Sequence, residues 1–579
     1  MTADPSAGAV SHLLTDWHAI PWKTVNEPVR RLHARIVQAT KAGQGHTVQA
    51  WPYLLTHSLS GKALAGRRVT ANPGKTTPGV DTVTWKDPES QAMAIHQRQQ
   101  RGDKALPLRR GYIPQPNGKK RPLGIPTMQD RAMQALSLQA LDPIAATLAA
   151  PNADGLRKAR SCADAMEQGA TVLSNGTRPP WRLAGDSKSC CDNISHPWLL
   201  SHIPREKTIL KKWLQAGSMD TSVLSPPEAG TPHGGLSSPV LANRTRDGLE
   251  RIRRKTYPHA GPQARKGMHQ QGNLVRYCDD CIITGLSREI LETDVPPLVT
   301  GFLRERGLAL SEEKTTITPI EEGCDFLGHH VRQYNGQCLT RPSKKNVKAF
   351  LTDLRKVIKE HKQATAYGLV APLNPTRRGW ANFHRHAAAK KTFAHVDRAI
   401  FQALWRWARR RHPTKGTRWV KDRYCGRSGN RNWRFFGQAQ DKEGKTTQNW
   451  LYLASATPIT RYKKIKGDCN PYDPTWESDL EERLGVKMAQ TLHGRRRLLY
   501  LWKEQGGLCP ICDQALTHVT GWHNHHIVYK TLGGAAHAEN RVLLHPKCPR
   551  QVHAKGLTVS KPRPAKDAPQ AQPGALFQA

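Results

Sequence analysis

Two adjacent carboxylates, Asp279 and Asp280, stand between apolar pairs in the sequence Leu-Val-Arg-Tyr-Cys-Asp-Asp-Cys-Ile-Ile of residues 274–283. The apolar flanks predict two short buried strands, and the acidic pair is typical of a tight turn between them. Such a hairpin would hold both carboxylates at its exposed tip, where oxygen ligands can bind magnesium against the phosphates of a nucleotide. A solvated turn without chemistry is the alternative, because aspartates are common turn formers.

A third carboxylate, Asp186, closes the short apolar stretch Leu183-Ala184-Gly185 upstream. Two-metal phosphoryl transfer needs carboxylates from separate strands, because the ions must lie about 4 Å apart and touch both the attacking and the leaving oxygen. We therefore expect Asp186 and Asp279 to meet on neighbouring strands. A strand-end residue that merely opens a turn is the alternative interpretation of Asp186.

Two pairs of metal ligands near the C-terminus have the spacing of a structural zinc site, namely Cys509 with Cys512 and His545 with Cys548. Between or beyond them lie further polar residues with ligand chemistry: His523, His525, His526, Asn540 and His553. Paired histidines at a strand end, with an asparagine and a further histidine, can bind one divalent ion and supply a general base for phosphodiester cleavage. A purely structural zinc knuckle is the alternative.

The composition indicates the class of partner. A chain of 579 residues with 88 basic and 46 acidic side chains has a formal charge of +42 and room for about three to five domains. Nucleic acid is the expected partner, because neutralising phosphates releases counterions. Membrane attachment is not expected, since there is no apolar run near about 18 residues and no lipidation signal. The N-terminus lacks signal-peptide features and the twelve cysteines suit reduced thiols and metal ligands, which predicts a cytoplasmic protein.

Periodicity predicts the elements that must position these residues. We expect a helix over 17–42, a hairpin over 107–126 with a basic tip at Asn117-Gly118, and amphipathic helices over 343–362 and 396–411. The segment 441–487 is polar and rich in turns, and we expect it to be a linker. Tryptophans among arginines offer stacking and phosphate contacts to RNA, with core packing as the alternative: Trp380, Trp405, Trp407 and Trp419.

Together with further motifs in the same order, these residues resemble bacterial group II intron-encoded proteins, which combine reverse transcriptase, maturase and HNH endonuclease activities. The likeness covers roughly residues 15–555. Its polymerase motifs are Arg121-Pro-Leu-Gly-Ile-Pro126, Asp186 to His196, Gly230-Thr-Pro-His-Gly-Gly235, Ser238-Pro239 with Ala242-Asn243, Tyr277-Cys-Asp-Asp280, Gly307-Leu308, Glu313-Lys314-Thr315 and Phe326-Leu327-Gly328. Its maturase motifs are Asn374-Pro375, Arg378-Gly379-Trp380, Trp407 and Arg410-Arg-His-Pro413.

The resemblance implies an α+β fold. It consists of a right-hand polymerase with fingers and an antiparallel palm sheet, an α-helical thumb and maturase domain, and a small zinc-containing ββα-metal HNH module. The implied domains are an N-terminal extension at 1–85, fingers and palm at 86–335, thumb and maturase domain at 336–440, a linker or DNA-binding region at 441–500, the HNH module at 501–558 and a disordered tail at 559–579.

The resemblance also assigns roles to residues. Asp186, Asp279 and Asp280 would bind Mg²⁺ in the palm, and the substrate would contact Arg121, Cys191, His233, Gly234, Tyr277 and Lys314. In the HNH module His526 would be the general base, and His525 and His553 would bind the ion, again expected to be Mg²⁺. Asn540 would fix the loop. Zn²⁺ would be held structurally by Cys509, Cys512, His545 and Cys548.

The implied function is RNA-directed DNA polymerisation from dNTPs, with binding of group II intron RNA to assist splicing and cleavage of target DNA for retrohoming. The implied particle is a ribonucleoprotein, with a dimer left open, located in the bacterial cytoplasm and on the nucleoid when bound to DNA. An RNA-binding splicing cofactor with decayed catalytic sites is the alternative. A stand-alone reverse transcriptase of a retron or phage-defence system is disfavoured by the maturase-like and HNH-like segments.

The chain departs from the family at several positions. Cysteine stands where the family usually has phenylalanine, and such exchanges cost about 2–4 kcal/mol each in a core: Cys191, Cys281, Cys324 and Cys425. His233 replaces a glutamine on the template side of the nucleotide site, and Cys191 removes the ring expected under the incoming sugar. Asp154 and Leu156 replace Tyr and Phe, as do Asp479 and Leu480 near the linker, and Pro549 replaces a histidine metal ligand. These changes favour the splicing-cofactor alternative, whereas the intact carboxylates favour the polymerase.

Overall fold

The computed structural model describes residues 17–560, apart from the following gaps: 19, 97–104, 115–117, 119, 175–180, 187–189, 205, 221–222, 226–228, 232–233, 257–272, 335–336, 430, 441–445, 493–495, 514, 518–519, 529–532, 536, 547, 550–551 and 553–558. Asn117, His233, His553 and the tail from 561 therefore lie outside the described residues, as do the side chains of Cys191 and Lys314.

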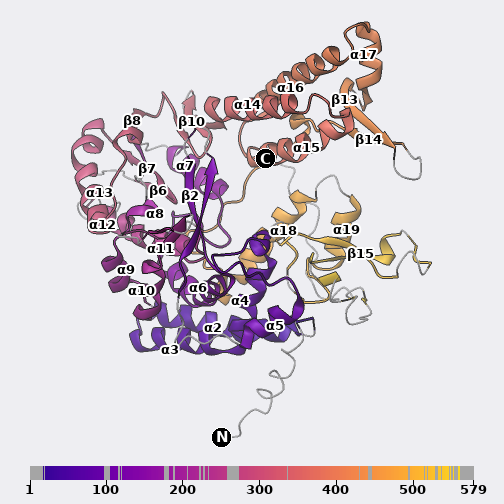
Figure 1. The fold of residues 1–579 in the computed structure, drawn as a ribbon. Helices are drawn as coiled ribbons and strands as arrows, with labels where there is room; N and C mark the ends of the chain where they lie inside the picture. The colour runs from indigo at the N-terminus through magenta and orange to yellow at the C-terminus, as the bar shows by residue number, and fades with distance from the viewer. Residues whose placement is uncertain are drawn as a thin grey trace.

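The N-terminal helices pack around one long helix, α6 (Met128–Leu148). They are α2 (Trp22–Lys41), α3 (Gly45–His57), α4 (Leu59–Ala71) and α5 (Pro88–His96). Helix α6 begins at Met128 because the Thr127 hydroxyl accepts a hydrogen bond from the Asp130 backbone N–H at 3.1 Å. The helix predicted over 17–42 is present as α2. Figure 1 shows these helices at the base of the molecule.

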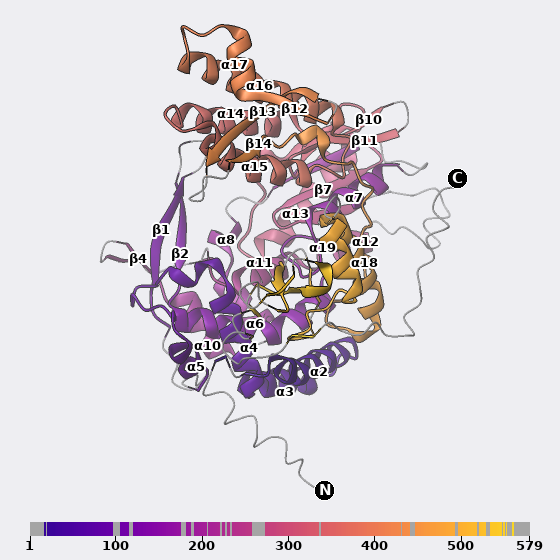
Figure 2. The same cartoon turned by 90° about the vertical axis from the view of Figure 1, so that its right-hand side faces the viewer.

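The predicted basic hairpin is present as β1 (Leu108–Pro114) and β2 (Lys120–Ile125), an antiparallel pair in which Arg121 lies opposite Ile113. It belongs to a four-stranded sheet of order β2-β1-β4-β5, completed by β4 (Ser218–Asp220) and β5 (Val223–Ser225). In both Figure 1 and Figure 2 the hairpin forms an arm that rises from the level of α6 toward the orange helices at the top.

The central sheet is antiparallel throughout and has the order β6-β7-β3-β8. Its strands are β3 (Trp181–Gly185), β6 (Leu274–Tyr277), β7 (Asp280–Gly285) and β8 (Thr316–Pro319). Alternate residues bury on opposite faces, with Leu274 and Ile283 in one core and Val275 and Ile282 in another. This sheet agrees with the predicted antiparallel palm.

Helices cover the central sheet. They are α7 (Cys162–Ser174), α8 (Cys190–Asn193), α9 (His196–His202), α10 (Lys207–Gln215), α11 (Ser238–Arg246), α12 (Leu249–Thr256) and α13 (Val295–Arg304). A π-helical turn, Ile290–Asp294, leads into α13, and a 3₁₀ turn, Glu312–Lys314, precedes β8. A three-stranded sheet then connects to the upper region: β9 (Cys324–Phe326), β10 (His329–Tyr334) and β11 (Gln337–Pro342).

The upper region combines helices α14 (Lys344–Glu360), α15 (Ala366–Phe383), α16 (Lys390–Arg411) and α17 (Thr417–Tyr424) with a three-stranded sheet. The strands are β12 (Cys425–Ser428), β13 (Arg431–Gln440) and β14 (Thr446–Trp450). Helix patterning predicted α14 and α16 but not the sheet. The sequence predicted that the thumb and maturase domain would end at residue 440. Because β14 pairs with β13, this region continues past that residue.

Residues 451–476, here called the strap, connect the upper region with the N-terminal helices and pass along the central-sheet region. The upper region lies at the top of Figure 1 and the N-terminal helices lie at the bottom. At the centre of the strap's path, the buried Asp164 carboxylate accepts hydrogen bonds from the backbone N–H of Ile465, the Tyr462 hydroxyl and Arg483 of α18 (Glu477–Thr491). At its lower end Lys41 and Asp473 form an ion pair at 2.5 Å. The segment predicted to be a linker is therefore packed against α7 and the N-terminal helices.

Replacing Asp164 with Ala is expected to destabilise this junction. The Arg483 side chain is 6% exposed and would lose its carboxylate, and breaking a buried pair costs about 3–5 kcal/mol. The urea midpoint of the unfolding transition that includes the strap should fall accordingly. Asp468→Ala, an exposed carboxylate on the same strap, is the matched control and should leave the midpoint nearly unchanged. Equal midpoints for both variants would show that Asp164 does not anchor the strap.

The C-terminal module follows α18 and is drawn in yellow in Figure 1. It contains α19 (Arg496–Glu504) and an antiparallel pair, β15 (His523–His526) and β16 (Arg541–Leu544). The buried Gln505 amide holds β16, because Leu543 donates to its Oε1 at 2.7 Å and its Nε2 donates to the Leu543 carbonyl at 2.9 Å. Among all the described residues, no helix is long and apolar enough to cross a bilayer.

Candidate functional site

The acidic hairpin of the central sheet has a two-residue turn. Tyr277 pairs with Asp280, so Cys278 and Asp279 form the turn and Asp280 begins β7. The sequence placed both aspartates in the turn, whereas the register assigns only Asp279 to it. Cys278 has φ of +57°, the left-handed conformation that glycine usually supplies at the first position of a type II′ turn. A strained non-glycine residue thus lies directly beside the carboxylates.

The strand register brings Asp186 to the same place. Gly185, the last residue of β3, pairs with Cys281, so the next position along the same register sets Asp186 opposite Asp280. Directly opposed residues in antiparallel strands have Cα atoms about 4.5–5.5 Å apart and side chains on one face. The Asp186 carbonyl also accepts a hydrogen bond from the Ser311 N–H at 2.8 Å, which ties the strand end to the turn that carries Lys314. The three carboxylates, one directly after β3, one in the turn and one at the start of β7, therefore lie at the same end of the sheet.

The groups around the carboxylates differ in access to water. Asp279 is exposed, whereas Asp186 and Asp280 are half-buried. Burial raises the pKa of the Cys278 thiol to about 11, and the nearby Asp279 charge adds to that shift. Burial also raises the pKa of Tyr277 to about 12. Both side chains are therefore neutral near pH 7, and the carboxylates are the anionic ligands that the hairpin offers.

A glycine that the sequence did not single out supports the turn from behind. A Cβ added to Gly155 would lie 2.2 Å from the Cys278 nitrogen and 2.5 Å from its Sγ, so only glycine fits. The preceding residues run alongside β6, where Asp154 N–H donates to the Arg276 carbonyl at 2.9 Å and Arg276 N–H donates to the Asn152 carbonyl at 3.0 Å. The loop before α7 is thus fixed against the acidic turn.

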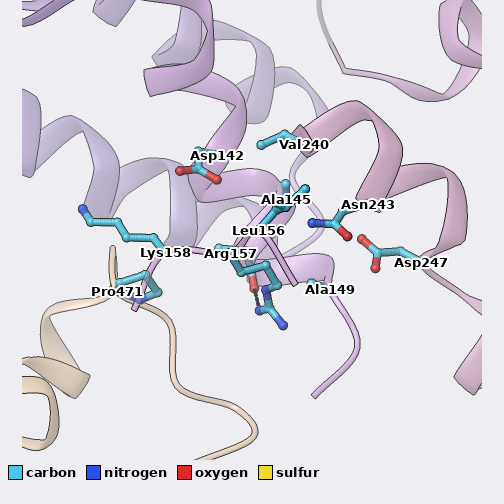
Figure 3. A pocket seen from close by; sticks show the side chains of 11 residues that line it. Asp142, Ala145, Ala149, Leu156, Arg157, Lys158, Val240, Asn243, Asp247 and Pro471 are labelled. Atoms are coloured by element: carbon cyan, nitrogen blue, oxygen red, sulfur yellow. Dashed lines mark hydrogen bonds between the residues drawn. The ribbon is translucent and has the colours of Figure 1, made fainter. Parts of the chain in front are cut away.

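A buried polar network holds both sides of this contact. Asn243 donates to the Gly155 carbonyl at 2.8 Å and accepts from Arg276 Nη1 at 3.2 Å, and Arg276 Nη2 donates to Asp247 at 2.8 Å. Burial lowers the pKa of the Arg276 guanidinium, and the Asp247 carboxylate opposes that shift. Figure 3 shows Asn243 and Asp247 side by side, facing the segment of Leu156 and its neighbours. Asn243 belongs to a recognised motif, but its partner Gly155 gave no signal in the sequence.

The pocket in Figure 3 has about 390 Å³ of empty space when its open mouth is included, and it lies between this segment, α6, α11 and Pro471 of the strap. Leu156 lines it, is 57% exposed and has φ of +55°. The resembled family usually has phenylalanine here, so the smaller side chain is consistent with open space at this position. Cys281, Cys324 and Cys425, the other described replacements of phenylalanine, are buried in the cores.

Two of the expected substrate contacts lie with the basic hairpin. Arg121 is exposed on β2. Gly234 has φ of +110°, and an added Cβ would lie 2.6 Å from the Gly124 carbonyl, so the glycine motif packs directly onto β2. His233 lies outside the described residues, as do the side chains of Cys191 and Lys314.

The predicted zinc ligands meet in the C-terminal module. One ligand atom from each of Cys509, Cys512, His545 and Cys548 lies within 4.8 Å of all the others, and all four residues are buried. Three thiols and an imidazole at this separation can surround one tetrahedral ion. The spacing of the two pairs in the sequence therefore predicted a real cluster.

The histidine strand lies beside this cluster. His525 is buried opposite Val542 in β16, whereas the adjacent His526 is half-buried opposite Arg541 and points to the other face. Asn540 fixes the loop that follows β15: it accepts from Val528 N–H at 2.7 Å and donates to the carbonyls of Val528 and Ala535 at 2.9 and 2.8 Å.

The tryptophans of the upper region divide between core and surface. Trp407 is 7% exposed, and Trp380 stacks on Phe350 with centroids 4.5 Å apart, so these two stabilise the helices. Trp419 and Trp433 are exposed, and Lys421 lies 5.0 Å from the Trp433 ring. The surface candidates for stacking are therefore Trp419 and Trp433, the second of which the sequence analysis did not name.

Comparison with known proteins identifies the domains in which these residues lie. Three family models match the chain: "N-terminal domain of reverse transcriptase" at residues 17–97, "Reverse transcriptase (RNA-dependent DNA polymerase)" at 113–331 and "Group II intron, maturase-specific domain" at 347–425. The chain therefore carries reverse transcriptase domains and a group II intron maturase domain. The relatives that it matches include a group II intron-encoded protein.

Among these relatives, Protein YkfC of Escherichia coli is 29% identical over 46% of this chain and 79% of its own length. The group II intron-encoded protein LtrA of Lactococcus lactis is 27% identical over 48% of this chain and 56% of its own length. The putative COX1/OXI3 intron 1 protein of Saccharomyces cerevisiae is 25% identical over 46% of this chain and 38% of its own length. A telomerase structure from Candida albicans aligns with a TM-score of only 0.31, over 55% of this chain and 64% of that chain at 11% identity, which supports no argument.

Proposed function

We propose that this protein copies RNA into DNA at the carboxylate cluster of Asp186, Asp279 and Asp280. The observation that carries the proposal is the strand register, which sets Asp186 opposite Asp280 beside the Asp279 turn. The donor set consists of carboxylate oxygens, which suit Mg²⁺. When bound there, Mg²⁺ would lower the pKa of the primer 3′-hydroxyl and neutralise charge on the triphosphate. We propose that one wall of the cleft, on the side of the dNTP and the template, is formed by the β1–β2 hairpin with Arg121 and by Gly234.

Extension of a DNA primer on an RNA template tests this proposal. The purified protein should incorporate dNTPs when Mg²⁺ is supplied and should stop when the ion is chelated. RNA binding without extension would instead favour the splicing-cofactor alternative, to which the replacements at Cys191 and His233 point.

The maturase domain is proposed to bind the intron RNA and so assist splicing. Support comes from the matched maturase domain and from a surface that pairs cations with exposed rings, such as Lys421 with Trp433 and Lys415 with Trp419. Rings and cations of this kind stack on bases and contact phosphates.

The C-terminal module is proposed to hold structural Zn²⁺ at Cys509, Cys512, His545 and Cys548. Metal analysis of the purified protein should find about one zinc per chain, and Cys512→Ser should lose it. Loss of the ion should also remove hydrogen-exchange protection from β16, because the ligands hold this strand's end. Cys338→Ser, which lies outside the cluster, should keep the zinc. Full zinc content in Cys512→Ser would exclude the cluster as the binding site.

We further propose that the C-terminal module cleaves one strand of the target DNA. In this proposal two residues of β15 carry the chemistry: His526 is the general base and His525 is a ligand of the catalytic ion. The rigid loop formed by Asn540 supports this, since it fixes the residues that follow the strand. Nicking of a duplex that contains the insertion site should be lost in His526→Ala, with zinc content and primer extension retained. Because Pro549 cannot bind a metal, Pro549→His would add a ligand for the ion. The variant should therefore nick DNA faster than the wild type. Nicking that survives His526→Ala would refute the assignment.

A further inference from the structure

A basic hollow lies beside the central sheet, lined by residues of α9, α11, α12 and α13 and of the loops next to them. Figure 1 shows α9, α12 and α13 on the side of the molecule opposite the yellow C-terminal module. The hollow has a volume of about 780 Å³ when its open mouth is included, which exceeds the size of a single phosphate. None of the three carboxylates of the proposed polymerase site lines it.

The lining of this hollow is cationic. Arg244, Arg251 and Arg306 line it together with one carboxylate, Asp247. That carboxylate is already engaged by Arg276 at 2.8 Å in the network behind the acidic turn. Arg306 also pairs with Glu305, whose Oε2 lies 2.7 Å from its Nη1. The three guanidinium groups therefore exceed the nearby carboxylates, and the hollow keeps a net positive charge. An anionic ligand is therefore expected.

Two of the arginines have donors that the protein itself does not use. The Nε atoms of Arg244 and Arg306 are both buried and make no hydrogen bond within the described part of the chain. Arg244 approaches Asp247 only at 3.6 Å, through Nη1. Helix α12 begins at Leu249, just before Arg251, and the positive end of its dipole adds to the field. Planar guanidinium forks beside a helix start are well suited to phosphate oxygens.

Aromatic rings mark the ligand as a nucleotide strand rather than a free anion. Trp198 and His202 stack with centroids 4.3 Å apart and planes within 7°, and His202 is exposed. Arg306 lies 3.6 Å from the Phe302 ring centre and 5.1 Å from that of Trp198, which holds its guanidinium in the wall. Exposed rings beside phosphate-binding cations are the chemistry by which proteins bind single-stranded RNA.

We propose that this hollow binds a backbone phosphate of single-stranded RNA, with the adjacent base against the Trp198–His202 stack. The site lies apart from the polymerase cleft and from the maturase domain, so it would hold a separate segment of the RNA. Asp247 in its lining accepts a hydrogen bond from Arg276 of β6. The hollow therefore adjoins the buried polar network that holds Gly155 against the acidic turn.

Photo-crosslinking of a short RNA containing 5-iodouridine tests the proposal, because this base forms adducts with nearby aromatic and histidine side chains. The experiment uses the full chain with Asp279→Ala and no dNTPs, so its outcome does not depend on polymerisation. Mass spectrometry should find an adduct on α9, at Trp198 or His202. Its yield should fall about tenfold in Arg251→Glu, with the thermal unfolding temperature of the variant recorded as a fold control.

The matched control is Lys211→Glu, an exposed charge reversal on α10 that lies outside the hollow and should leave the adduct yield near its original level. Adducts elsewhere but none on α9, or an α9 adduct that survives Arg251→Glu, would overturn the proposal. AMP and inorganic phosphate distinguish the sources of the ligand. If either raises the unfolding temperature of the parent but not of Arg251→Glu while RNA gives no α9 adduct, a free phosphate compound rather than RNA is the occupant.

Discussion

Replacing Asp279 with Ala is expected to abolish DNA synthesis on an RNA template. Asp279 is the exposed member of the carboxylate cluster, and its removal takes away one of three anionic ligands. Neither Cys278 nor Tyr277 can replace it, since both are neutral near pH 7. Metal stabilisation of the transition state contributes several kcal/mol, so the rate of primer extension should fall by about 10³-fold or more. Single-turnover extension with Mg²⁺ measures this loss.

The control for Asp279→Ala is Asp353→Ala, which removes an exposed carboxylate from α14 and should leave the rate near that of the wild type. Binding of the primer and template should be similar in both variants, because Asp279 is proposed to act on the ions and not on the nucleic acid. Equal extension by wild type and Asp279→Ala would refute the carboxylate assignment.

Gly155→Ala is expected to produce a smaller but still large defect, although this residue contacts neither the ions nor the substrate. The new methyl group would collide with the Cys278 nitrogen at 2.2 Å, and the backbone on either side is fixed by the hydrogen bonds of Asn243 and Arg276. The acidic turn must therefore move. Displacement of a catalytic group by about 1 Å costs on the order of 10²-fold in rate. The kcat for primer extension should fall by about this factor, with a smaller change in the KM for dNTPs.

Gly169→Ala provides the control, because it makes the same change in α7, where an added Cβ meets nothing within 4 Å. Alanine is the better helix former, so this variant should be slightly more stable and fully active. A Gly155→Ala protein with normal kcat would show that the loop does not set the position of the turn.

The local elements of the palm could be predicted because their patterns depend on neighbouring residues. Apolar pairs on both sides of Asp279 and Asp280 define the strands, and two intervening residues between ligands define the cysteine-histidine cluster. The same holds for the basic hairpin and for helix α14, where Ser343 caps the first turn by accepting from the Asn346 N–H.

Two contacts between distant segments could not be predicted, because no local sequence pattern indicates them. Gly155 is one glycine among 46, and only the fold brings it under Cys278. Asp164 likewise looks like an ordinary helix-start residue until the strap supplies Tyr462, Ile465 and Arg483. The polar composition of the strap suggested a free linker, yet its polar groups are the ones that bind the palm.

Anomalous diffraction from manganese most directly tests whether the three carboxylates form one ion site. Crystals of the protein with primer, template and a non-reactive dNTP analogue would be grown with Mn²⁺ in place of Mg²⁺. We predict anomalous peaks within about 2.5 Å of carboxylate oxygens from both Asp186 and the acidic turn. Peaks at only one of these positions, with the carboxyl groups of Asp186 and Asp279 more than about 8 Å apart, would contradict a shared two-ion site.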